Sequence, residues 1–358
     1  MFRTTFGPRP TRLRLLAAVT AALGCAVTVS SCAGPDGVDL GTDWKGAQVF
    51  VLAKVNGEVT VVGINPVKGT AESLAVVPQQ SDDDSVLAPQ ILQQADGNWL
   101  VSVPRKGGKA SRLYAIDRKE KTLAKVGEAE ELRELVPGKS LMGQVDGLAT
   151  VRKSGQDKGR QTTSVLVTRS ASGAVVREAH VPGTVTLAAS GAATDRVCLV
   201  ADSAGHDVVS TLDLSSGNVE GVGETGLANV SALACADGRP VVAGAPEAKT
   251  SLKGVSVRQT AQSMVLTSGD GEISRVAADG PSVVAVQAAG DAGVLFVRLG
   301  SDGKVQQQVK VSGLSSAEGL HVVDRGWVLT EGDRAAVVDV RTGKSTSFAL
   351  PGDLLAAD

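Results

Sequence analysis

The chain has 358 residues, of which 42% are hydrophobic and 21% charged, with 36 Lys and Arg against 38 Asp and Glu. A formal charge of −2 excludes a generally basic nucleic-acid-binding protein, so no nucleic-acid partner is expected. The mixed composition excludes wholesale disorder and a polytopic membrane protein, and four cysteines exclude a disulfide-rich mini-fold.

The N-terminal segment has the pattern of an export signal. Four arginines precede Leu15, no acidic residue occurs before Asp36, and an apolar stretch ends at Val29. A positive n-region followed by a short apolar region is typical of a secretory signal, and the apolar part is short for a transmembrane helix. The sequence therefore predicts a signal peptide over residues 1–31.

The end of this segment, Val29-Ser30-Ser31-Cys32, resembles the bacterial lipobox. In bacterial lipoproteins the cysteine thiol is acylated with diacylglycerol and the signal is cut before it. The resemblance implies a lipidated Cys32 as the mature N-terminus, followed by a tether over residues 32–46. Cys25 is a weaker candidate, and a plain signal peptide with an incidental cysteine is the alternative.

Lipidation would place the protein on the extracytoplasmic side of the cell membrane. Removing residues 1–31 leaves 32 basic and 38 acidic residues, so the mature chain is not drawn electrostatically to anionic lipid. The acyl chains would therefore have to hold the protein at the membrane.

From residue 47 to residue 358 short valine-rich runs alternate with turns, which predicts β-strands. The runs Gln48–Leu52 and Val59–Val62 are joined by Asn56-Gly57, the strongest short hairpin signal. Long helical periodicity is absent, and the clearest helix-like segment is the short acidic stretch Glu128–Leu135.

Two features recur along these strands. The first is an aspartate turn between apolar runs, at an average spacing of about 46 residues. These turns lie at Asp96, Asp146, Asp195, Asp237, Asp291 and Asp324. The second is a hairpin whose loop usually contains glycine. These hairpins lie at Ile64–Gly69, Ile116–Lys119, Val167–Gly173, Leu212–Gly217, Val265–Gly271, Val297–Gly303 and Val338–Gly343.

A period of 40–50 residues with about four strands per unit predicts an all-β fold, a β-propeller. The length of residues 47–358 and the seven hairpins favour seven blades; six or eight blades, or a pair of β-sandwiches, are the alternatives. The first unit shows only one strand before its hairpin, which residues 38–46 or the C-terminal end would complete. The short step after Asp291 predicts that the sixth unit lacks a strand.

The hairpins at Tyr114–Leu123 and Val338–Thr346 resemble the PQQ-like and YVTN-type propeller repeats. The resemblance implies a repeat propeller over most of the mature chain. The tryptophan that closes the PQQ-type repeat is missing from all seven hairpins, so no quinone cofactor is expected.

The remaining candidate site residues are few. Cys198 and Cys235 lie in predicted strands and form either one disulfide or two buried free thiols. Trp99 and Trp327 follow equivalent aspartate turns and indicate packing between blades, with an aromatic or carbohydrate ligand site as the alternative.

The charged and titratable candidates favour plain structural roles. The three histidines, His180, His206 and His321, have no metal-ligand spacing and are expected at the surface or at strand edges. The acidic run Ser81–Ser85 is interpreted as a solvated loop, with a site for a hard cation such as Ca²⁺ as the alternative. The basic run Arg105–Lys109 is also interpreted as a loop, with contact to an anionic partner as the alternative. We therefore predict no catalytic residue, no metal and no cofactor.

Two functions are compatible with these patterns. The first is a lipid-anchored extracytoplasmic β-propeller that acts as a binding or scaffold module for an envelope protein or polymer. The second is a propeller enzyme, either a quinone-dependent dehydrogenase or a hydrolase or lactonase. The missing repeat tryptophan and the sparse histidines favour the first.

Overall fold

The computed structural model describes only part of the chain, and all of that part belongs to one compact unit, Cys32–Asp358. The predicted signal peptide, Cys32, the acidic run Ser81–Ser85 and the basic run Arg105–Lys109 lie outside the described residues. The described ranges are 37–78, 89–93, 97–104, 110–130, 134–137, 147–157, 160–169, 175–190, 195–223, 225–247, 255–260, 262–268, 271–280, 282–290 and 293–357.

These ranges form β-strands and turns, with no α-helix. The strands are β1 (Val49–Val55), β2 (Glu58–Asn65), β3 (Thr70–Val76), β4 (Gln90–Gln93), β5 (Trp99–Pro104), β6 (Ala110–Asp117), β7 (Thr122–Glu130), β8 (Glu134–Pro137), β9 (Gly147–Asp157), β10 (Arg160–Arg169), β11 (Val175–Pro182), β12 (Thr184–Ser190), β13 (Arg196–Ser203), β14 (His206–Asp213), β15 (Val219–Gly221), β16 (Leu227–Ala236), β17 (Arg239–Pro246), β18 (Val255–Gln259), β19 (Met264–Ser268), β20 (Ile273–Asp279), β21 (Ser282–Ala288), β22 (Val294–Leu299), β23 (Val305–Val311), β24 (Gly319–Val323), β25 (Gly326–Glu331), β26 (Arg334–Asp339), β27 (Lys344–Ala349) and β28 (Asp353–Ala356).

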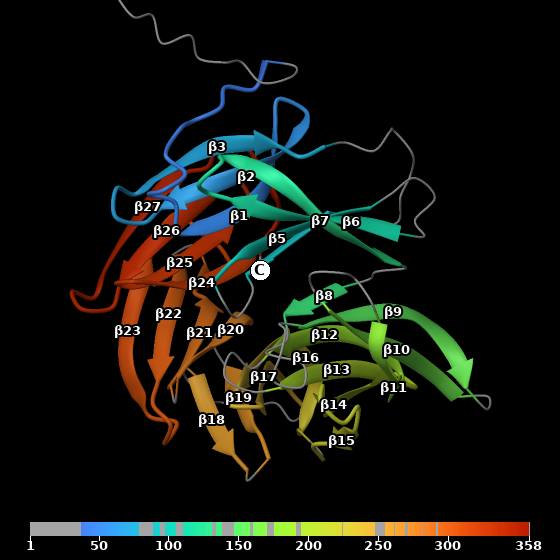
Figure 1. Cartoon of the computed structure of the whole chain (residues 1–358). Coiled ribbons are helices and arrows are strands. Elements are labelled where there is room, and N and C mark those ends of the chain that lie inside the picture. The colour runs from blue at the N-terminus through green and yellow to red at the C-terminus, as the bar shows by residue number, and fades with distance from the viewer. Residues whose placement is uncertain are drawn as a thin grey trace, which may run out of the picture. The chain divides into compact units, whose positions relative to one another are not determined.

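The strands are grouped into seven four-stranded sheets, numbered here by their order in the chain (Figure 1). Sheet 1 is β28-β1-β2-β3, sheet 2 is β4 to β7, sheet 3 is β8 to β11, and sheet 4 is β12 to β15. Sheet 5 is β16-β17-β19-β18, sheet 6 is β20 to β23, and sheet 7 is β24 to β27. Each sheet contacts the next one, and β27 of sheet 7 contacts β3 of sheet 1.

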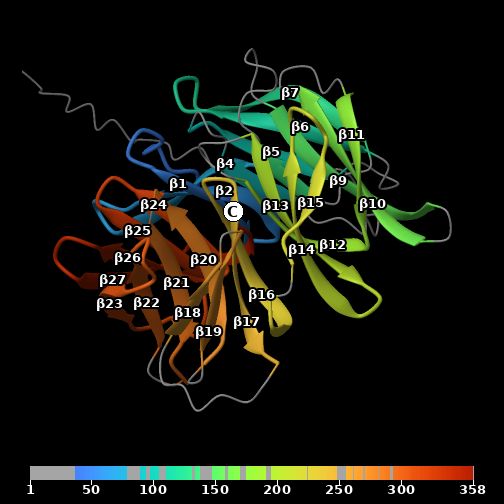
Figure 2. The ribbon, with the colours of Figure 1, turned by 90° about the horizontal axis from the view of Figure 1, so that it is seen from below.

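This ring of contacting sheets is a β-propeller, which confirms the all-β propeller prediction and excludes a pair of β-sandwiches (Figure 2). Because each sheet packs between two neighbours, its middle strands are buried on both faces. All six residues of β5 are buried, as are five of the six residues of β25. Double burial explains why the runs are nearly continuous in valine and leucine rather than alternating with polar residues.

The C-terminal strand β28 completes the first sheet. It pairs antiparallel with β1, with Ala356 opposite Leu52 and Asp353 opposite Lys54. Of the two completions that the sequence left open, the C-terminal end is therefore the correct one. The first and last strands of the domain are hydrogen-bonded neighbours in one sheet.

The prediction that the sixth unit lacks a strand is wrong. Sheet 6 has four strands, and the turn between its first two strands is formed at Asp279-Gly280. Asp291 falls one strand later in the sequence, between β21 and β22. Asp279 lies 42 residues after Asp237 and 45 before Asp324. The spacing of the turns is therefore regular when Asp279, and not Asp291, is the aspartate of the sixth unit.

The predicted hairpin at Val265–Gly271 is also wrong. In sheet 5, β19 pairs parallel with β17 and antiparallel with β18, and the residues after β19 lead into sheet 6. Met264, Val265 and Leu266 of β19 are buried, whereas β18 is partly exposed. The more apolar strand takes the inner position, and the more polar one forms the edge of the sheet.

The helix-like segment Glu128–Leu135 is not helical in its described residues. Residues up to Glu130 belong to β7, and Glu134 begins β8. Pairing of β7 with β6 and of β8 with β9 satisfies the backbone of these residues. Tertiary strand pairing here overrides the weak helical preference of glutamate and leucine.

A repeated side-chain cap builds the turn between the third and fourth strands of four sheets. In each turn the Oδ1 atom accepts hydrogen bonds from the backbone N–H groups two and three residues later, at 2.8–3.2 Å. Side chains of this type mimic a backbone turn. The four capping residues, which define the Asx turns, are Asn65, Asp117, Asp213 and Asp339.

These caps are stronger when the aspartate is ionised. Hydrogen bonds from Ser215 and Ser216 lower the pKa of Asp213. The backbone N–H groups of Arg341 and Thr342 lower the pKa of Asp339 in the same way. The aspartates that cap these hairpin turns, Asp117, Asp213 and Asp339, are therefore structural residues that stabilise turns.

The fourth residue after each cap adopts a left-handed backbone conformation. Gly69, Gly217 and Gly343 have φ of 66–76° at this position. Lys121 occupies the equivalent position in sheet 2, with φ of 55°. A residue with a Cβ pays roughly 1–2 kcal/mol for this conformation, and glycine does not.

Lys121→Gly is therefore expected to raise the free energy of unfolding by about 1 kcal/mol, because it removes this strain. The reciprocal change Gly343→Ala is expected to lower the free energy by a similar amount, since a Cβ at residue 343 would meet only an ordinary contact with Gln307. Urea denaturation midpoints of both variants measure the two effects. Destabilisation by Lys121→Gly would contradict the explanation.

Candidate functional site

The two tryptophans that follow aspartate turns, Trp99 and Trp327, pack between neighbouring sheets. Trp99 is 1% exposed and its ring lies edge-on to Phe50 of sheet 1, with ring centroids 5.7 Å apart. Trp327 is 2% exposed and packs against Phe296 of sheet 6, at 6.2 Å. Both rings fill the space between neighbouring sheets, so the packing prediction is confirmed and the ligand-site alternative is not supported.

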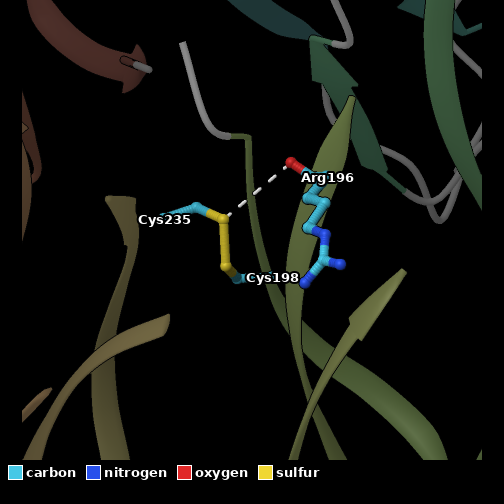
Figure 3. The surroundings of a disulfide bond; sticks show 3 residues. All are labelled: Arg196, Cys198 and Cys235. Atoms are coloured by element: carbon cyan, nitrogen blue, oxygen red, sulfur yellow. Dashed lines mark hydrogen bonds between the residues drawn. A yellow bond between two sulfur atoms is a disulfide. The ribbon is translucent and has the colours of Figure 1, made fainter. Parts of the chain in front are cut away.

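A disulfide joins Cys198 and Cys235, which is one of the two alternatives that the sequence left open, the other being two buried free thiols. Cys198 lies on β13 of sheet 4 and Cys235 on β16 of sheet 5, so the bond links two neighbouring sheets (Figure 3). Both cysteines are buried, and the Sγ atom of Cys235 lies 3.9 Å from the carbonyl oxygen of Arg196.

The three histidines lie in different environments. His180 and His206 are exposed on β11 and β14, as expected. His321 on β24 is only 5% exposed, so the expectation of a surface histidine is wrong for it. In the part of the chain that the structure describes, no group of three or more His, Cys, Asp or Glu side chains is placed to hold a metal ion.

His321 belongs to a cluster of buried polar groups between sheets 7, 1 and 2. Its ring lies 5.5 Å from that of Trp99. Thr330 is opposite Gly319 on the neighbouring strand; a Cβ on Gly319 would lie 2.5 Å from Thr330 Oγ1 and 3.1 Å from His321 Nε2. Among the described residues, the polar atoms His321 Nε2, Thr330 Oγ1 and Trp99 Nε1 have no hydrogen-bond partner.

Burial sets the protonation state of His321. Burial lowers its pKa to about 4, and the positive charge of Arg275 lowers it in the same direction. Arg275 is held nearby by hydrogen bonds from its Nε and Nη2 atoms to the carbonyl oxygen of Glu318. His321 is therefore neutral at pH 7, because burial disfavours its charged form.

The segment before β1 is packed on sheet 1, whereas the sequence predicts a tether over residues 32–46. Val38 and Trp44 are buried in the same hydrophobic cluster as β1. The N–H of Gly41 donates to the carbonyl oxygen of Ser73 on β3 at 2.6 Å. The packed domain therefore begins at Val38, nine residues before the predicted boundary at residue 47.

Asp43 fixes the far end of this segment. Its Oδ2 atom accepts hydrogen bonds from Lys68 Nζ at 2.8 Å and Asn65 Nδ2 at 3.0 Å, and its Oδ1 atom accepts one from the N–H of Gly46 at 2.9 Å. The bonds from Lys68 and Asn65 lower the pKa of Asp43. Asp43 thus connects the segment to the Asx turn at Asn65.

In the ranges given above, the chain forms no helix with the length and apolar character that a membrane crossing requires.

Comparisons with known proteins bear on the fold alone. No protein-family model matches the chain, and no curated protein matches its sequence. Acylaminoacyl peptidase from Pyrococcus horikoshii is similar in structure, with a TM-score of 0.53 and 15% identity over 84% of this chain. This chain spans about half of that protein, 52% of its length.

Two further structures are more distant. The β-propeller domain of the Trilobed protease from Pyrococcus furiosus has a TM-score of 0.48 and 15% identity, over 85% of this chain and 91% of its own. TolB from Acinetobacter baumannii has a TM-score of 0.47 and 10% identity, over 89% of this chain and 68% of its own. At TM-scores under 0.5 these two likenesses carry no argument about this chain, and at 15% identity the likeness to the acylaminoacyl peptidase concerns the fold alone.

Proposed function

We propose that the chain is an exported, lipid-anchored β-propeller that binds another protein or a polymer of the cell envelope. The observation that carries the proposal is the disulfide between Cys198 and Cys235, because such bonds form and persist in oxidising compartments outside the cytoplasm. The arginine-rich leader and the sequence Val29-Ser30-Ser31-Cys32 support the same location and supply the point of lipid attachment.

A binding role is supported by how the repeated side chains are used. Asp117, Asp213 and Asp339 cap their own turns, and Trp99 and Trp327 fill spaces between sheets. The recurrent residues therefore build a rigid ring, and recognition is left to the surfaces of its loops. We take the seven four-stranded sheets as the blades of this ring, since each contacts its neighbours in chain order.

Cys32→Ala is expected to abolish incorporation of an alkyne-labelled fatty acid and to stop the chain from partitioning into the detergent phase of Triton X-114, because the acceptor thiol is gone. Cys25→Ala is the matched control and is expected to leave both properties unchanged. Labelling that survives Cys32→Ala, or is lost in Cys25→Ala, would contradict attachment at Cys32.

Crosslinking followed by purification tests the binding role. The wild-type chain is crosslinked in intact cells, purified through a C-terminal tag and compared with an equally abundant, lipid-anchored control protein. We expect one envelope protein or polymer to be enriched reproducibly with the wild type. Equal recovery of every component with the control would contradict the binding role.

A further inference from the structure

Only a short stretch of chain separates the proposed lipid from the packed domain. Residues 33–37 lie between Cys32 and Val38, and Val38 is fully buried. Six Cα–Cα steps span at most about 20 Å when extended. The domain is therefore held within about that distance of its acylated cysteine, which is less than the width of a typical domain.

Residues 33–37, which we call the short tether, join the domain at one end of its sheets. The side-chain amide of Asn56 donates to the carbonyl oxygen of Gly37 at 3.4 Å. Asn56 and Gly57 form the turn between β1 and β2. We call the end that carries this turn the hairpin end; it also carries the turn Gly332-Asp333 between β25 and β26. The Asx turns lie at the opposite end.

The contacts of residues 37–43 show in which direction this segment runs along sheet 1. From Gly37 it runs along sheet 1, bonds to Ser73 midway along β3, and reaches the Asx turn of sheet 1 only at Asp43. The seven residues of β1 separate the two ends by about 20 Å. The Asx-turn end therefore lies about one strand length farther than the hairpin end from Gly37, where the chain coming from Cys32 joins the domain.

We propose that the hairpin end faces the lipid bilayer and that the Asx-turn end is displayed away from it, where a partner can reach it. This inference rests on the proposed lipid anchor. The mature chain carries more acidic than basic residues, so the orientation arises from the short tether and its point of attachment rather than from attraction to anionic lipid.

Matched pairs of labelled cysteines test the orientation. Lys54→Cys and Asp333→Cys place an exposed label at the hairpin end of sheets 1 and 7. Val67→Cys and Arg341→Cys place one at the Asx-turn end of the same two sheets. Each acylated variant is labelled with a fluorophore and bound to phosphatidylcholine vesicles that contain a lipid with a spin-labelled headgroup.

Quenching by the headgroup label is expected to be at least twofold stronger at the hairpin-end position of each pair. Lengthening the tether by twenty Gly and Ser residues after Ala33 is expected to reduce this difference within each pair. Equal quenching of Lys54→Cys and Val67→Cys would mean that sheet 1 lies edge-on, and stronger quenching at the Asx-turn end would mean the opposite orientation; either result overturns the inference.

Sedimentation of the same samples with the vesicles tests the lipid anchor separately. A chain that fails to sediment with the vesicles overturns the proposed lipid anchor and the orientation together. A chain that sediments but shows no difference within the pairs overturns the orientation alone.

Discussion

The double substitution Cys198→Ala and Cys235→Ala is expected to lower the free energy of unfolding by about 4 kcal/mol. The bond closes a loop of about 38 residues, and opening it restores conformational entropy to the unfolded chain on the loop-closure model. Urea denaturation with the chain held at equal concentration measures the change as a lower midpoint and an unchanged folded-state spectrum.

Reduction of the wild type supplies the control. Because both cysteines are buried, dithiothreitol alone is expected to react slowly with the folded chain and quickly in urea. The reduced wild type should then match the double variant within 1 kcal/mol. Equal stability of the oxidised wild type and the double variant would show that the bond does not constrain the unfolded chain.

Stability is expected to fall by about 2 kcal/mol between pH 7 and pH 5 through His321 alone, and by about 3 kcal/mol at pH 4. The pKa of His321 is lowered from 6.5 to about 4 in the folded chain, so the unfolded chain binds the proton first as the pH falls. Protonation therefore favours unfolding throughout the window between these two pKa values, and above pH 7 the effect vanishes.

His321→Gln isolates this contribution. Glutamine keeps hydrogen-bonding capacity near Thr330 but does not titrate, so the difference in unfolding free energy between wild type and variant should change by about 2 kcal/mol from pH 7 to pH 5. His206→Gln, which replaces an exposed histidine at the start of β14, is the matched control variant. If the unfolding free energies of the wild type and of His321→Gln changed equally with pH, a buried neutral histidine would be ruled out.

The strands and their turns could be predicted because each unit repeats the same local chemistry. Valine-rich runs are buried on both faces, Asn56-Gly57 forms the turn between β1 and β2 with φ of 49° and 91°, and the capping aspartates occupy equivalent turns. These features depend on a few neighbouring residues, so they are visible in the sequence.

The errors came from features that depend on distant parts of the chain. The order of strands in sheet 5 is set by how well β19 is buried against β17, which no local pattern reports. Burial of His321 depends on Trp99, which is more than two hundred residues away in the sequence. Val38 and Trp44 fall within the predicted tether, because only the folded sheet 1 offers the surface that buries them.

Pairing of β28 with β1 has a consequence for how the protein is made. The first sheet lacks its innermost strand until Asp353–Ala356 have been synthesised, so sheet 1 is completed only after the other six sheets. A chain whose first sheet is still incomplete suits the export across the membrane that we propose. On the proposed export route, completion of sheet 1 and oxidation of the cysteines would both follow the crossing of the membrane.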